Sequence, residues 1–315
     1  MSTKTPKETF DLTDPTVAQM AQEAPETHPD HPLITGKSTA NMLVEKDVQI
    51  TCSDGAVVVC DVFRPNKAGQ FPVLMSCGPY GKDIPFELHW PYEYARSGEH
   101  SPYMTIETVN PESWVADDYV VVRVDQTGTG KSPGVIDVWS PRDTGHFVDS
   151  VEWAGAQNWS SGKVGLIGVS YYSASQIAVA ANAPASLAAI IPWEVGHNLY
   201  SEFARHGGIR SSGFVDFWFQ FWILSNQHGR TVLDEEQLAT NWVNFPQLAA
   251  EHELFDEFWQ ERTADPSRVN VPLFTAGNWA GPSMVLRSHI DLYQQATSCS
   301  KWLRVHTGGH IEPFY

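Results

Sequence analysis

The sequence predicts an α/β fold with a mostly parallel sheet and helices on both of its faces. Two features of the 315 residues support this class. Short runs rich in β-branched residues alternate with segments of helical spacing from residue 118 to residue 306. Residues 118–125 form a nearly continuous apolar run, which is typical of a strand that is covered on both faces.

The predicted strands are, in order, 47–52, 56–63, 72–77, 118–125, 163–170, 187–193, 270–277 and 301–306. Ser53-Asp54-Gly55 joins the first two, and this is a hairpin signal because glycine can adopt a positive φ. Helical spacing is found at 143–157, 171–183 and 283–297. Residues 78–116 are rich in proline, glycine and aromatic residues, so we expect a long loop there.

The same pattern divides the chain into four parts. Residues 1–40 contain five prolines and scattered charge, and we expect a disordered tail. Residues 41–197 are expected to form the first part of the core, and residues 269–315 its last strands. Residues 198–268 interrupt the alternation with a helical insertion. An insertion at the carboxyl edge of a parallel sheet lies over the ligand crevice, so we expect a helical cap.

Composition and charge exclude several classes of protein. Twenty Lys and Arg against 37 Asp and Glu give a net charge of −17, which argues against binding to nucleic acid or to an anionic membrane surface. No apolar run approaches the roughly 20 residues of a membrane span, and residues 1–12 lack the apolar stretch of a secretory signal. The four cysteines include no CxxC pair, so neither a zinc site nor a redox motif is expected. These features predict a cytoplasmic protein with free thiols.

Ser170 is the predicted nucleophile. It lies in Gly168-Val169-Ser170-Tyr171-Tyr172, between an apolar strand and an alanine-rich helix. In a nucleophile elbow the strand turns so sharply into the helix that a strained serine projects its Oγ above the sheet. Tyr172 replaces the second glycine of the usual pattern. The alternative is a serine that only caps the helix.

Two groups are candidates for an oxyanion hole, and one histidine for the general base. The backbone N–H of Tyr171 would begin the helix after Ser170, where the helix dipole favours negative charge. Tyr80 offers a hydroxyl on the turn 78–82, although this residue taken alone favours a packed loop aromatic. His310 follows the flexible Thr307-Gly308-Gly309 and is the predicted base, whereas His306 still belongs to the last strand.

The acid that orients the histidine is expected in the turn after the penultimate strand, but residues 277–281 contain no carboxylate. Glu194 is predicted instead, because it ends the preceding strand and would reach the same space. Asp216 and Asp291 are the alternatives.

The 12 Trp, 15 Phe and 10 Tyr residues favour an aromatic pocket for an apolar substrate. The candidate lining residues are Trp218, Phe219, Trp222 and Trp279.

Several segments together resemble the cocaine-esterase-like and X-Pro-dipeptidyl-peptidase-like acyl esterases, a family of α/β-hydrolases. They include Pro79-Tyr80-Gly81-Lys82, residues 125–134, residues 151–165 and the elbow at Ser170. The resemblance extends over about residues 42–315. It implies an α/β-hydrolase fold and hydrolysis of esters or amides through an acyl-enzyme. It also implies that the Tyr80 hydroxyl and the Tyr171 N–H form the oxyanion hole, and that no cofactor or metal takes part.

The chain departs from that family pattern in three places. Thr127 replaces the usual arginine of a DxRGxG segment, which is expected to loosen a structural loop. The turn 277–281 lacks the usual aspartate, which favours an acid relocated to Glu194. The sequence ends at residue 315, before the last core helix and the C-terminal jelly-roll domain of family members.

The predicted function is that of a serine hydrolase acting on a small-molecule ester or amide of a small organic acid. One alternative passes the acyl group to an acceptor other than water, as an acyltransferase or cyclase in small-molecule biosynthesis. The other is a non-catalytic, hydrolase-like binding protein. The sequence shows no clear acidic cluster for a free amine, and this disfavours X-Pro peptidase activity.

Overall fold

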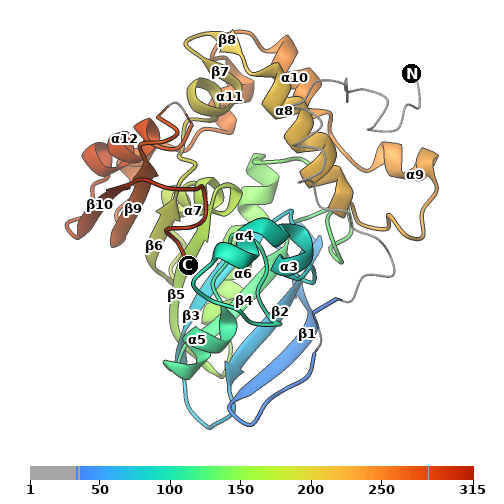
Figure 1. Ribbon diagram of the computed structural model, residues 1–315, viewed down its shortest axis with the longest axis vertical. Coiled ribbons are helices and arrows are strands. Elements are labelled where there is room, and N and C mark those ends of the chain that lie inside the picture. Colours follow the sequence, from blue (N-terminus) through green and yellow to red (C-terminus); the bar gives the residue numbers. More distant parts are fainter. Residues whose placement is uncertain (1–32, 35, 283) are drawn as a thin grey trace.

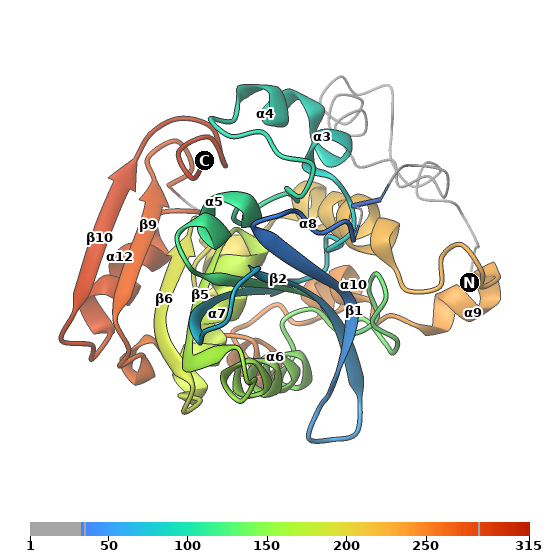
Figure 2. The same ribbon diagram turned by 90° about the horizontal axis from the view of Figure 1, so that it is seen from below.

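The computed structural model describes residues 33–34, 36–282 and 284–315, which include an eight-stranded sheet with helices on both faces (Figures 1 and 2). The strand order is β1-β2-β4-β3-β5-β6-β9-β10. The strands are β1 (Met42–Thr51), β2 (Val57–Pro65), β3 (Phe71–Gly78), β4 (Val120–Asp125), β5 (Ser160–Val169), β6 (Leu187–Trp193), β9 (Leu273–Asn278) and β10 (Lys301–His306). β1, β2 and β4 pair antiparallel, and the remaining pairs are parallel. The predicted fold class is confirmed.

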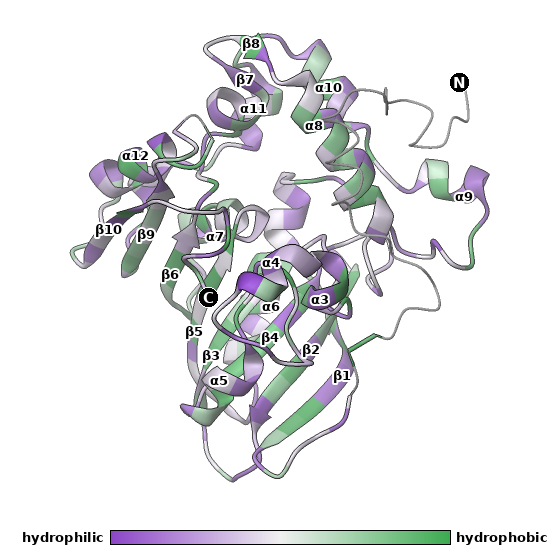
Figure 3. Ribbon diagram, in the orientation of Figure 1, coloured by the Kyte–Doolittle hydropathy of each residue, from purple (hydrophilic) through white to green (hydrophobic). Residues whose placement is uncertain are grey.

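The apolar runs of the sequence become the buried strands. β4 is buried at all of its positions, and Figure 3 shows apolar residues concentrated along the strands of the sheet. The β1–β2 hairpin turns at Gly55, whose φ is 88°, and the Asp54 carboxylate accepts a hydrogen bond from the Ala56 N–H at 2.9 Å. The turn residues therefore act as the sequence predicts.

Three helices pack on one face of the sheet: α6 (Pro141–Gly155), α7 (Tyr171–Asn182) and α12 (Arg287–Gln295). α5 (Pro111–Ala116) lies on the opposite face (Figure 2). α6 begins where the Ser140 side chain accepts a hydrogen bond from the Asp143 N–H and Pro141 takes the first helical position. The three predicted helices are confirmed within a few residues at each end.

The expected long loop at 78–116 contains three short helices, and this corrects the sequence prediction. They are α3 (Phe86–His89), α4 (Pro91–Arg96) and α5. Helices of four to six residues are too short to show a helical period in the sequence. Pro91 and Pro111 mark two of the starts, since proline is favoured in the first helical turn.

The insertion between β6 and β9 is less regular than a bundle of helices. It also contains a two-stranded antiparallel hairpin of β7 (Arg205–His206) and β8 (Ile209–Arg210). Its helices are α8 (Ser212–Trp218), α9 (Glu235–Thr240), α10 (Phe245–Glu251) and α11 (Glu257–Glu261), with the π- or 3-10-helical turns η1 (Tyr200–Ala204), η2 (Phe219–Ile223), η3 (Leu224–Asn226) and η4 (Pro266–Arg268). Side chains of α8 and η2 share a cavity with Ser170 at the end of β5, so this part of the insertion covers the carboxyl edge of the sheet.

Two expectations about local order need correction. Ile34 is buried and its N–H donates to the Asp83 carbonyl at 2.9 Å, so the chain contacts the body before residue 40. The rest of the expected tail, residues 1–32, lies outside the described residues. Thr127 does not loosen its loop, because it is buried and its Oγ1 lies 2.6 Å from Nδ1 of His146.

The helices of the described residues are all too short or too polar to cross a membrane.

Candidate active site

Ser170 lies at the junction between β5 and α7 in a strained backbone conformation. Its φ is 59° and its ψ is −115°, a region that residues with a Cβ rarely adopt. Its side chain makes no capping hydrogen bond, so the helix-cap alternative is wrong. Gly168 has a φ of 155°, and a Cβ there would lie 2.5 Å from the Cβ of Tyr172. The turn therefore requires glycine before the serine.

Tyr172 occupies the position of the missing second glycine because another glycine makes room for it. Gly78 ends β3, beside the elbow, and a Cβ at Gly78 would lie 2.6 Å from Cε1 of the Tyr172 ring. Tyr172 is buried against Tyr80, with ring centroids 5.8 Å apart. The elbow thus accommodates a large residue through a glycine on the neighbouring strand.

His310 and Glu194 are in contact, as the sequence predicts. Nδ1 of His310 lies 2.6 Å from Oε2 of Glu194. Glu194 is 1% exposed, and its N–H donates to the Ala276 carbonyl at 2.8 Å, which fixes the residue just beyond β6. Asn278 Nδ2 donates to the other carboxylate oxygen at 2.9 Å. Both oxygens of the acid are therefore engaged.

The two alternative acids lie elsewhere. Asp216 is in the insertion and pairs with Arg210 at 3.0 Å. Asp291 is on α12, where its charge acts on His197. Among the described residues, the carboxylates that contact His310 are Glu194 and Glu107.

Glu107 was not identified from the sequence. Its Oε1 lies 3.3 Å from Nε2 of His310, and its Oε2 is buried with no hydrogen-bond partner. It lies in the loop before α5 with a φ of 61°. Burial raises the pKa of Glu107, and the hydrogen bond to His310 opposes that rise. Nothing in the sequence marks this glutamate among the 37 acidic residues.

The two carboxylates determine the charge of His310. Burial alone would lower the pKa of the imidazole, but hydrogen bonds to Glu107 and Glu194 raise this pKa to about 10. His306 lies nearby, with Nε2 3.2 Å from Oε1 of Glu194, and burial lowers its pKa. The contacts with two carboxylates therefore favour the imidazolium form of His310, whereas burial favours the neutral form of His306.

The Tyr80 hydroxyl is oriented to donate into the site. Its oxygen accepts a hydrogen bond from Nε1–H of Trp218 at 2.8 Å, so its own proton is available to another acceptor. Burial, and then the charge of Glu107, raise the pKa of Tyr80 well above its ordinary value, while a contact with the Ser170 side chain opposes this rise. The phenol is therefore a neutral donor beside the serine. Tyr171 is the first residue of α7.

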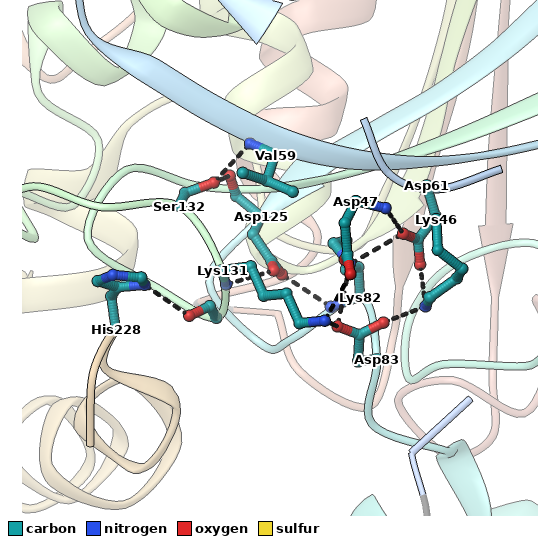
Figure 4. A network of polar contacts seen from close by, with 11 residues as sticks. Lys46, Asp47, Val59, Asp61, Lys82, Asp83, Asp125, Lys131, Ser132 and His228 are labelled. Carbon is teal, nitrogen blue, oxygen red and sulfur yellow. Dashed lines mark hydrogen bonds and ion pairs between the residues drawn. The ribbon is translucent and has the colours of Figure 1, made fainter. Parts of the chain in front are cut away.

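A network of charges surrounds Lys82, which lies two residues after Tyr80 (Figure 4). Asp125, at the end of β4, accepts hydrogen bonds from the N–H groups of Lys82 at 2.8 Å and Lys131 at 2.9 Å. Asn226 of the insertion donates to the Pro79 carbonyl at 2.7 Å. The turn before Lys82 is thus tied to the sheet and to the insertion.

The same network contains three acidic side chains that lie close enough together to hold a metal ion: Asp47, Asp61 and Asp83. Lysine ammonium groups pair with these carboxylates instead. Lys82 Nζ contacts Asp47 at 2.6 Å, Asp61 at 2.8 Å and Asp83 at 2.9 Å, and Lys46 bonds to Asp61 and Asp83. The arrangement fits an internal ion-pair cluster better than a cation site.

Ser170 and His310 open into one cavity of about 170 Å³. Aromatic side chains form most of its wall, and Glu107 is the carboxylate that faces it among the described residues. The lining residues are Tyr80, Trp90, Glu107, Ser170, Phe214, Phe217, Trp218, Trp222 and His310.

Two predicted pocket residues lie outside this cavity. Phe214, Trp218 and Trp222 face it at helical spacing. Phe219 is one position further than Trp218, so it points away and is fully buried within the insertion. Trp279 follows β9 near the edge of the sheet and is 64% exposed.

A larger cavity of about 420 Å³ is lined by residues that include the stacked Trp139 and Tyr171 rings. Its wall includes Asp143 and His197 but neither Ser170 nor His310. The larger cavity is therefore not the candidate active site, despite its volume.

Comparisons with known proteins agree with the predicted fold and family. The family model described as X-Pro dipeptidyl-peptidase (S15 family) matches residues 54–312. A crystal structure of a CocE/NonD family hydrolase from Staphylococcus aureus is 36% identical, with a TM-score of 0.78, and the match covers 87% of this chain and 48% of that chain. The cocaine esterase of a Rhodococcus species is 30% identical over 160 residues, which is 51% of this chain and 25% of the esterase.

The solved structure of an α-amino acid ester hydrolase is 17% identical, with a TM-score of 0.61. The match covers 91% of this chain and 52% of the ester hydrolase, which shows that the two share a fold. The chain spans between 25% and 35% of the curated relatives it matches.

Proposed function

We propose that this chain, which belongs to the X-Pro dipeptidyl-peptidase (S15) family, is a serine hydrolase that cleaves an ester or amide of a small organic acid. One observation carries the proposal. Ser170, His310 and Tyr80 line the same cavity. Glu194 contacts Nδ1 of His310, and not Nε2, the nitrogen that would accept the serine proton. A nucleophile, a base, a donor and an orienting acid are the parts that acyl transfer requires.

In the proposed reaction, neutral His310 accepts the Ser170 Oγ proton at Nε2 while Oγ attacks the substrate carbonyl carbon. The Tyr80 O–H and the Tyr171 N–H donate to the oxygen that becomes negative. Glu194 accepts the Nδ1–H and stabilises the imidazolium. His310 then protonates the leaving alcohol or amine, and the acyl group remains on Ser170. Water, activated by His310, attacks the acyl-enzyme and releases the acid.

The size and wall of the cavity support a small, apolar acyl group. A dry cavity of roughly 150 Å³ in another protein accepts a benzene ring, and this cavity measures about 170 Å³. Rings of Trp90, Trp218 and Trp222 offer flat apolar contacts. We therefore propose an acid no larger than about one aromatic ring. X-Pro peptides are not proposed as substrates, because Glu107 already contacts His310 and no second carboxylate lines the described cavity.

The experiment that tests the function is labelling with a fluorophosphonate, followed by intact mass and peptide mapping. We expect one adduct on Ser170, and none in Ser170→Ala. Ser175→Ala is the matched control, because Ser175 is on the same helix but its Oγ donates to the Tyr171 carbonyl. A Ser170→Ala protein that folds but keeps more than about a tenth of the turnover of a chromogenic ester would refute the nucleophile.

Product analysis distinguishes hydrolysis from acyl transfer. With an activated ester and competing alcohols or amines, a hydrolase releases the free acid, whereas an acyltransferase gives mainly the transferred product. A folded protein that is neither labelled nor active would be a binding protein.

We also propose a cytoplasmic location for the protein. It is supported by the free thiols of the four cysteines, which are Cys52, Cys60, Cys77 and Cys299.

A further inference from the structure

We propose that Glu107 is a positioning residue that holds His310 as an imidazolium in the free protein and so sets the pH at which Ser170 becomes a nucleophile. The effect on turnover rests on the proposed function. The effect on the imidazole itself does not, and it can be measured separately.

The inference begins with the two ring nitrogens of His310. Nδ1 faces Glu194 at 2.6 Å and Nε2 faces Glu107 at 3.3 Å. A neutral imidazole carries one N–H, so it can donate to one of these carboxylates and must present a lone pair to the other. The doubly protonated ring donates to both. The geometry therefore favours imidazolium, which cannot accept the Ser170 proton.

The loop that carries Glu107 is braced, so the carboxylate is held in place. The Glu107 carbonyl accepts the Val169 N–H at 3.1 Å, which ties the loop to the residue before Ser170. Buried Arg123 donates to the Tyr103 carbonyl and, at 2.8 Å, to the Val109 carbonyl. The Tyr315 hydroxyl donates to the Thr108 carbonyl at 3.0 Å. A glutamate at positive φ in such a loop is a strained residue of the kind that clusters at functional sites.

The other titratable groups around His310 do not take this role. Glu194 faces it from the end of β6 and His306 from β10, both on the Nδ1 side. Tyr80, on the turn after β3, is a neutral phenol. On the outer side of the 307–310 loop, Glu312 pairs with Arg96 at 3.4 Å and accepts the Gly309 N–H at 3.3 Å. Glu107 is therefore the charge that acts on Nε2.

The sign of the pH effect follows. The base must be neutral, so activity is low below the pKa of His310 and rises as pH passes through it. When pH rises, the Nε2 proton leaves to solvent, and the freed nitrogen can accept the hydrogen bond of the Ser170 hydroxyl. Because Glu107 stabilises the imidazolium, removing its charge must lower the pKa of His310 and extend activity to lower pH.

The first test is the pH profile of kcat/KM, which reports the free enzyme. Glu107→Gln keeps the shape of the side chain and removes its charge. We expect the acid limb of the profile to move down by about 1–3 pH units, the usual effect of one close opposite charge. Glu112→Gln removes an exposed charge five residues along the chain and should leave the limb in place. A Glu107→Gln enzyme that is slower at every pH, with an unmoved limb, would overturn the proposal.

The second test titrates the His310 imidazole directly by NMR in the folded protein, with its signal assigned from a His310→Gln spectrum. We expect the pKa of His310 to fall in Glu107→Gln and to stay unchanged in Glu112→Gln. Should wild type prove inactive while this pKa still falls, the proposed function fails and the Glu107 assignment holds. An unchanged pKa refutes the assignment whatever the activity. Glu107→Asp, which keeps the charge but withdraws it, should give an intermediate shift if the Gln variant does not fold.

Discussion

The side-chain amide of Asn278 donates a hydrogen bond to Oε1 of Glu194 at 2.9 Å. The same amide donates to the Gly308 carbonyl at 3.3 Å, two residues before His310. Asn278 ends β9 and Glu194 follows β6, and these two strands are neighbours in the sheet. The turn that lacks a carboxylate therefore supports one supplied by the next strand, and it joins that carboxylate to the loop of the histidine.

Glu194→Gln should leave the fold intact and lower kcat by about 10⁴-fold, because an amide can favour the wrong imidazole tautomer. A generic chromogenic ester measures turnover, and circular dichroism checks folding. Asp216→Asn and Asp291→Asn are controls and should stay within about threefold of wild type. If Glu194→Gln remains active and one of these aspartate variants does not, the acid lies in the insertion or on α12.

Asn278→Ala should lower kcat by about tenfold or more, because a hydrogen bond to a charged group is worth about 1.5 kcal/mol or more. Its effect depends on Glu194, so the loss should be much smaller when it is measured in the Glu194→Gln background. In that background Asn278→Asp should instead restore part of the activity by returning a carboxylate to the turn. Equal losses from Asn278→Ala in both backgrounds would show that Asn278 does not act through Glu194.

The sequence was sufficient for the parts of the site that strand order determines. Ser170 lies between an apolar strand and a helix, and Glu194 ends a strand whose neighbour in the sheet follows from the α/β alternation. His310 follows a glycine-rich turn, in which Gly308 has a φ of 117°. Each of these positions depends on local pattern and on parallel pairing, both of which leave a signal in the sequence.

Residues whose place depends on loop conformation could not be predicted. Glu107 reaches His310 from a loop in which its own φ is positive. A positive φ can be predicted from the sequence at a glycine but not at a glutamate. Phe219 and Trp218 are adjacent and both aromatic, so only the orientation of α8 and of the following η2 decides which one lines the cavity. The abundance of aromatic residues makes Trp279 a candidate for the pocket, whereas the turn directs it to solvent.

Tyr80→Phe should lower kcat and kcat/KM together by roughly 10²–10³-fold, since an oxyanion donor acts only in the transition state. The ring of Tyr80 packs against Tyr171 and Trp222, and phenylalanine preserves these contacts. Steady-state kinetics with one ester over a wide concentration range separates kcat from KM. A variant that changes KM alone would show that Tyr80 only lines the cavity.

Lys82→Met should destabilise the fold by about 3–5 kcal/mol, because it removes one of the two ammonium groups that pair with the buried carboxylates. The Lys82 side chain is 1% exposed and contacts Asp61, whose side chain is 0% exposed, at 2.8 Å. Lys131→Met is the matched control in the same network. Lys131 pairs with Asp47 at 2.6 Å but its side chain is 46% exposed, so its loss should cost about 1 kcal/mol or less.

Urea unfolding at pH 7, followed by tryptophan fluorescence, compares the two variants with wild type. We expect the midpoint of Lys82→Met to fall far more than that of Lys131→Met. Because Lys82 follows the Tyr80 turn, the Lys82 variant should also lose turnover under conditions in which it is still folded. Similar midpoints for the two variants would mean that Lys46 alone compensates Asp61 and Asp83, with which it also bonds, and that Lys82 does not hold the turn.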